Sequence, residues 1–117
     1  MGRRSRRRGA EALAAPEVPY DAEGATLVLR GALSPATRME YAKVRAGGLD
    51  QEDAWQRSVE FLFERLAVRW EIAGAEPLER QKDLLARFRF ATGEERAWIR
   101  GVLRTHLTAH FPDMEAP

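Results

Sequence analysis

Four stretches of this chain begin with residues that start helices, and each continues with apolar side chains at helical spacing. Side-chain oxygens at a helix start accept hydrogen bonds from backbone N–H groups that the first turn leaves without partners. The start signals are Ser34-Pro35, Asp50, Glu76-Pro77 and the capping box of Thr92 and Glu95. We therefore expect four helices, over residues 35–46, 51–73, 76–90 and 93–109.

The second of these helices is expected to be the longest and the most apolar. The side chains that recur along one face are Trp55, Val59, Leu62, Leu66 and Trp70. Further apolar side chains, at Phe61, Phe63, Val68 and Ile72, lie on the flanking faces. This apolar surface is wider than one core-facing stripe requires, which predicts a central helix or one that faces both a core and a partner.

Residues 25–30, with the sequence Ala-Thr-Leu-Val-Leu-Arg, are the only good strand candidate. One strand cannot form a sheet, so a second strand has to come from residues 18–21 or from another molecule. A homo-oligomer is one way to supply it.

The expected fold is mainly α: a compact four-helix domain with a short N-terminal strand or hairpin and a flexible basic arm. Its connections are short, which favours a bundle. With 44% hydrophobic and 32% charged residues, the chain has the composition of a globular protein. We expect a flexible arm over residues 1–19, the helical domain over 20–112 and a tail over 113–117.

The arm is strongly basic. It carries five arginines and no acid in its first nine residues, at Arg3, Arg4, Arg6, Arg7 and Arg8. Since the whole chain has a net charge of +1, the remainder has 1 − 5 = −4. Such a cluster can contact nucleic-acid phosphates without sequence specificity. It lacks the aromatic residues that stack on bases, so a solvated tail is the alternative.

Motifs of enzyme active sites are missing from the sequence. There is no cysteine, so thiol nucleophiles and thiolate metal sites are excluded. No serine stands in a G-x-S-x-G turn, and Gly47-Gly48 is not followed by the lysine of a phosphate-binding loop. The adjacent acids Glu94 and Glu95 are explained by their place at a helix start. We expect a protein that is not an enzyme and has no cofactor.

One weak candidate for a metal site remains. His106 and His110 are four residues apart, so both lie on one helix face, the spacing of two zinc ligands in metalloprotease helices. The glutamate that would follow the first histidine is absent, although Asp113 could supply a third ligand. The alternative is that His106 packs near the core and His110 stabilises the helix end, and we expect no metal.

Aromatic residues point to a partner surface. Phe61 and Phe63, and likewise Phe88 and Phe90, are two residues apart and so point to different sides of a helix. One of each pair cannot share the main core stripe. The predicted partner contacts are Phe61, Phe63, Trp70, Phe88 and Phe90.

The order of elements resembles that of tail assembly chaperones of long-tailed bacteriophages. The resemblance covers about residues 20–111. It rests on the strand at Thr26–Arg30, the capped helix after Ser34-Pro35, and the long helix with Phe61–Leu66 and a W-x-x-x-G segment from Trp70 to Gly74. It implies a non-enzymatic protein that coats the tape-measure protein during tail building and recruits tail-tube protein. It also implies absence from the finished particle, and for many members a frameshift-extended form.

No apolar run approaches the roughly 20 residues that span a bilayer, so no membrane association is expected. The expected location is the cytoplasm of the bacterial host cell. Two alternative functions are a nucleic-acid-binding accessory protein that uses the arginine arm, and a structural subunit of a phage particle.

Overall fold

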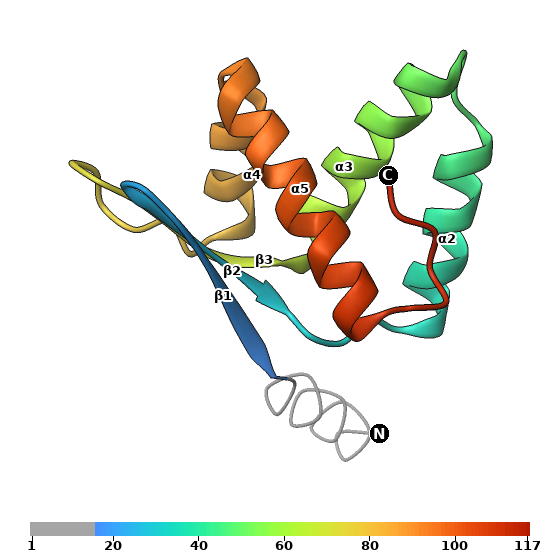
Figure 1. Cartoon of the computed structure of the whole chain (residues 1–117), viewed down its shortest axis with the longest axis horizontal. Coiled ribbons are helices and arrows are strands. Elements are labelled where there is room, and N and C mark those ends of the chain that lie inside the picture. Colours follow the sequence, from blue (N-terminus) through green and yellow to red (C-terminus); the bar gives the residue numbers. More distant parts are fainter. Residues whose placement is uncertain (1–15) are drawn as a thin grey trace.

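The computed structural model describes residues 16–117 and places a three-stranded antiparallel sheet beside four helices (Figure 1). The strands are β1 (Glu17–Ala22), β2 (Ala25–Arg30) and β3 (Ala67–Ile72), in the order β1-β2-β3. The helices are α2 (Pro35–Ala46), α3 (Gln51–Leu66), α4 (Gln81–Arg89) and α5 (Gly93–His110). The expected four-helix domain is therefore wrong, because the fold combines helices with a sheet of three strands.

The third strand lies where the end of the long helix was predicted. Helix α3 ends at Leu66, and Ala67 already has extended backbone angles (φ −66°, ψ 124°). Trp70 fits both descriptions, since it stands four residues after Leu66 and also belongs to an alternating series of Val68, Trp70 and Ile72. The alternation prevails because β2 offers a row of backbone partners, with Trp70 opposite Leu27.

Strands β1 and β2 form the hairpin that the sequence allowed as one alternative. The two-residue turn between Ala22 and Ala25 contains Gly24, whose φ of 77° lies in the left-handed region that glycine adopts without strain. Because β2 pairs with β1 on one side and with β3 on the other, it needs no strand from another molecule. The lone strand that suggested a homo-oligomer thus finds both of its partner strands within one chain.

Three of the four predicted helix starts are confirmed by their hydrogen bonds. Ser34 accepts from the Thr37 N–H, Asp50 accepts from the Asp53 N–H, and Thr92 and Glu95 form a reciprocal capping box. The remaining helix, α4, begins at Gln81 and not at Glu76-Pro77. In between, Leu78 exchanges two backbone hydrogen bonds of 2.9 Å with Trp70, so this segment extends the sheet edge before the helix begins.

The core lies between one face of the sheet and the helices. Leu27 and Leu29 are fully buried, whereas Val28 between them faces the other side of the sheet. The ring of Phe63 stacks on Phe88 at 4.8 Å between centroids and meets Trp70 edge-on at 5.5 Å. Aromatic side chains from α3, α4 and β3 therefore join the two layers.

The predicted domain boundaries shift at both ends. Residues 17–19, assigned to the arm, form the first half of β1, and residues 1–15 lie outside the described part of the chain. The predicted tail, residues 113–117, packs against the domain through Met114, Ala116 and Pro117. Within residues 16–117, none of the helices combines the length and the apolar character required to cross a bilayer.

Candidate partner-binding groove

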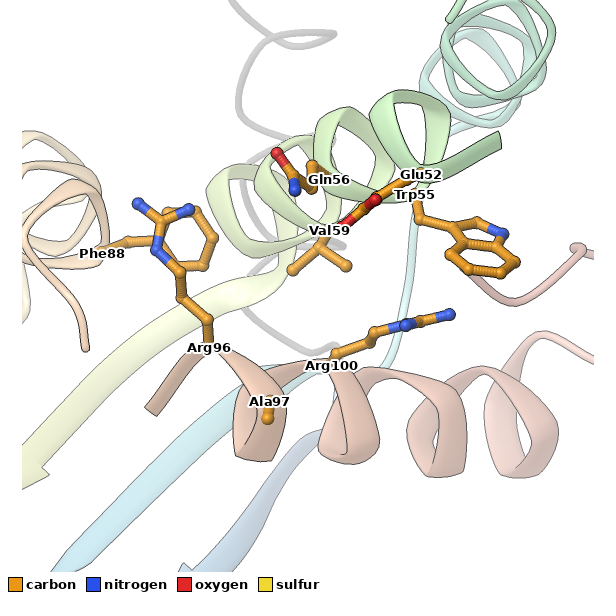
Figure 2. A pocket seen from close by; sticks show the side chains of 8 residues that line it. All are labelled: Glu52, Trp55, Gln56, Val59, Phe88, Arg96, Ala97 and Arg100. Carbon is orange, nitrogen blue, oxygen red and sulfur yellow. The ribbon is translucent and has the colours of Figure 1, made fainter. Parts of the chain in front are cut away.

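A groove lies between the N-terminal halves of α3 and α5. The α2–α3 and α4–α5 turns lie apart at the same end of the molecule, and the helices converge below them (Figure 1). The cavity between them has a volume of about 320 Å³. Its lining residues are Glu52, Trp55, Gln56 and Val59 of α3, Arg96, Ala97 and Arg100 of α5, and Phe88 of α4 (Figure 2). We call this cavity the α3–α5 groove.

Apolar side chains line the α3–α5 groove and arginines stand over them. The Arg100 guanidinium lies 4.4 Å from the centroid of the Trp55 ring, and that of Arg96 lies 4.9 Å from the centroid of Phe88. Attraction between a cation and the face of a ring contributes about 0.5–2 kcal/mol, so these contacts orient both guanidinium groups at the groove. The groove therefore presents apolar surface flanked by two positive charges.

The chain's own residues 111–117, which we call the C-terminal segment, continue the line of this groove between α5 and α2 (Figure 1). Phe111 is 1% exposed, and Met114 and Ala116 pack against the core. The Arg38 guanidinium lies 5.1 Å from the centroid of the Phe111 ring. Apolar anchors thus hold a segment that has no regular secondary structure.

Polar groups of α2 hold the middle of the C-terminal segment. The Tyr41 hydroxyl donates to the Glu115 carbonyl at 2.5 Å, and burial raises the pKa of Tyr41 to about 12. Arg45 forms an ion pair of 2.7 Å with the Glu115 carboxylate. Two other nitrogens of this guanidinium, Nε and Nη1, are buried without a hydrogen-bond partner among the described residues. The pairing of Arg45 is therefore incomplete.

Helix α5 holds the end of the C-terminal segment. Arg100 Nε and Arg104 Nη1 donate to the Pro117 carbonyl oxygen at 3.1 and 2.6 Å. Because Arg100 also stacks on Trp55, it joins the C-terminal segment to the open α3–α5 groove.

The five predicted partner contacts lie in three different environments. Phe63, Trp70 and Phe88 are at most 1% exposed and belong to the core, although Phe88 also lines the α3–α5 groove. Phe61 is half-buried against Tyr41, with a centroid distance of 6.1 Å. Phe90 is 85% exposed at the turn before α5. A partner could reach Phe63 or Trp70 only if the domain opened.

Sequence reasoning missed the residues that form the walls of the groove. Trp55 was assigned to the core stripe of a long helix, and Arg96 and Arg100 were not considered. A signal was present, because Arg96, Arg100 and Arg104 follow at intervals of four and so share one face of α5.

His106 holds the sheet to α5 and is not placed as a metal ligand. Its Nε2 lies 2.8 Å from the Arg30 carbonyl and its Nδ1 lies 2.7 Å from the Tyr20 hydroxyl. A carbonyl only accepts, so we assign the proton to Nε2, and the Nδ1 lone pair then accepts from Tyr20. Neither nitrogen of His106 is left for a metal, although the His110 ring lies 4.7 Å away. Among residues 16–117, no three histidine, aspartate or glutamate side chains are grouped to hold a metal ion.

We expect the buried position of His106 to make the domain less stable as the pH falls below about 6.5. Burial lowers the pKa of His106; the hydrogen bond to the Arg30 carbonyl opposes this effect in part, and the nearby His110 adds to it. Above about pH 6.5 the His106 imidazole is neutral in both the folded and the unfolded state. On acidification the unfolded state binds a proton at this residue first. Stability is then lost progressively as the pH falls through the lowered pKa of the folded state.

Urea unfolding at pH 7.5 and 5.5 measures this loss. His106→Gln keeps a donor and an acceptor but does not titrate, so it is expected to flatten the pH dependence. His110→Gln, on the exposed side of α5, serves as the control and should retain most of the pH dependence. An unchanged pH dependence in His106→Gln would contradict the assignment.

Comparisons with protein-family models, with curated proteins and with solved structures found no match for this chain. The five arginines of the predicted arm lie outside the described residues.

Proposed function

We propose that this protein is a non-enzymatic binding protein that acts as a tail assembly chaperone of a long-tailed bacteriophage. It works in the cytoplasm of the bacterial host and holds an apolar helical segment of the tape-measure protein in the α3–α5 groove. Tail-tube protein is a further partner of the same assembly step. The observation that supports this function best is the open groove, which exposes apolar surface between two helices of a well-packed domain.

The residue types at the groove are those that contribute most to protein interfaces. Tryptophan and arginine are enriched among residues whose removal costs 2 kcal/mol or more of binding energy. Trp55 and Arg100 stand together on opposite walls, with their groups 4.4 Å apart. The half-buried Trp55 supplies apolar surface that an amphipathic helix can cover, and Val59 and Phe88, which are 6% and 1% exposed, line the groove beside it.

Co-expression with the cognate tape-measure protein tests the proposal. The wild-type chain is expected to raise the soluble fraction of that protein, because covering its apolar segments prevents aggregation. Trp55→Ala should weaken binding by about 30-fold, the equivalent of about 2 kcal/mol, and so remove most of the gain.

Leu49→Ala provides the matched control. Leu49 is 90% exposed in the turn before α3 and is not part of the groove lining, so its loss should leave the gain intact. Circular dichroism shows whether both variants remain folded. Absence of any gain with the wild-type chain would refute the chaperone function. Stoichiometric presence of the protein in purified virions would indicate a particle subunit instead.

A further inference from the structure

The arginines of α5 form no ion pair with an aspartate or glutamate side chain among residues 16–117. Arg57, Arg65, Arg69, Arg87 and Arg89 each form an ion pair with an aspartate or glutamate. Arg30, Arg38 and Arg80 likewise lack such a pair within the described part of the chain, and Arg100 and Arg104 instead donate to the Pro117 oxygen. Two of the α5 arginines, Arg96 and Arg100, line the α3–α5 groove, so two positive charges stand there beside the carboxylate of Glu52.

The positive charge of Arg96 and Arg100 is opposite in sign to the net charge of the rest of the domain. Residues 10–117 have a net charge of −4, since the chain carries +1 and its first nine residues +5. Among residues 16–117, Glu52 is the one acid that lines the α3–α5 groove. An acidic ligand is therefore attracted to the groove and repelled by much of the remaining surface.

The C-terminal segment shows what chemistry the arginines of α2 and α5 accept beside the groove. Its sequence, Phe-Pro-Asp-Met-Glu-Ala-Pro, contains two acids, no base and several apolar anchors. Glu115 pairs with Arg45, Phe111 packs under Arg38, and the Pro117 carbonyl accepts from two arginines of α5. An acidic chain with apolar anchors thus already occupies the region that adjoins the open cavity.

We propose that the open α3–α5 groove binds an acidic, amphipathic helical segment of a partner protein. The apolar anchors of that segment pack on Trp55, and its carboxylates pair with Arg96 and Arg100. This inference rests on the proposed function for the existence of a protein partner and adds the charge class of the segment. A single-stranded nucleic acid also has phosphates for the arginines and bases that stack on aromatic rings, and competition with an oligonucleotide distinguishes it from a peptide.

The test uses the full chain and two synthetic peptides. The first is a 14-residue peptide made of two copies of Glu-Leu-Glu-Glu-Leu-Leu-Ala, and the second has lysine in place of each glutamate. Binding is followed by calorimetry, with tryptophan fluorescence as a second readout because Trp55 lies in the groove. The acidic peptide is expected to bind at least about tenfold more tightly than the lysine peptide.

Two substitutions are chosen to remove the positive charge and to keep the fold, which circular dichroism checks. Arg96→Glu places an acid near the start of α5, where the helix dipole favours it. Arg100→Gln retains an amide donor for the Pro117 carbonyl. The double variant should bind the acidic peptide at least about tenfold more weakly than wild type, the equivalent of about 1.4 kcal/mol. Arg80→Glu, an exposed position outside the groove, should change binding by less than about threefold.

Several results would overturn the inference. These are equal binding of the two peptides, an equal loss in Arg80→Glu, and full displacement of the acidic peptide by a single-stranded oligonucleotide. If the wild-type protein self-associates and the double variant does not, the groove binds a second copy of this chain, which would also overturn the inference.

The two proposals fail in different ways. If the acidic peptide binds but the tape-measure protein gains no solubility, the chaperone function is wrong and the charge preference of the groove stands. If solubility rises but the acidic peptide does not bind, the charge preference is wrong and the chaperone function stands.

Discussion

Replacing Phe88 with alanine is expected to lower the free energy of unfolding by about 3–5 kcal/mol, whereas the same change at Phe90 should cost less than about 0.5 kcal/mol. Phe88 is 1% exposed and stacks on Phe63, so alanine there leaves a cavity between α3 and α4. Phe90 is 85% exposed and loses little contact. Two phenylalanines of one helix end therefore differ sharply in their contribution to stability.

Urea denaturation of both variants, with circular dichroism as the signal, measures the difference. The two changes remove the same atoms, so each serves as the control for the other. Because such domains are stable by only about 5–15 kcal/mol, Phe88→Ala is expected to shift the unfolding midpoint strongly. Similar losses at both positions would contradict the placement of α4 on α3.

Leu27→Asp is expected to abolish the folded state, and Val28→Asp to be tolerated. Leu27 is fully buried at the centre of the sheet, opposite Tyr20 on β1 and Trp70 on β3. An aspartate there removes apolar burial worth about 2–5 kcal/mol and buries a carboxylate without a partner, which costs several kcal/mol more. Together these losses reach the total stability expected of the domain.

Val28 is the matched control because it is the next residue on the same strand and faces away from the helices. Its neighbour on β3 is Arg69, so an aspartate at this position gains an opposite charge across the strands. The near-ultraviolet circular dichroism spectrum reports whether each variant retains packed aromatic side chains. A folded Leu27→Asp variant would show that the sheet does not close on the helices.

The helix starts were predictable because a cap is a local interaction. Ser34, Asp50 and Thr92 each satisfy a backbone donor within three residues of themselves, so no distant contact is needed to fix them. The helical spacing that continues to Trp70 was misleading because it, too, is only a local pattern. Residues 67–72 have a spacing that suits either structure, and the choice depends on β2, which lies far away in the sequence.

The candidate site was only partly predictable. The aromatic residues predicted as partner contacts lie in α3, in β3 and at the end of α4, and burial divides them into core side chains, the half-buried Phe61 and the exposed Phe90. Trp55 and the arginines of α5 come together only because α3 and α5 cross. Periodicity along one helix gives the face that a residue occupies but not the element that this face meets.

The sequence by itself determined where three of the four described helices begin, how the charge is divided between the arm and the body, and which enzyme motifs are missing. These are properties of neighbouring residues or of composition. The tertiary structure decided that the end of the predicted long helix is a strand, that His106 bridges the sheet and α5, and that a groove flanked by arginines lies between α3 and α5. Each of these depends on backbone or side-chain groups that meet across dozens of residues, where long-range pairing overrides local preference.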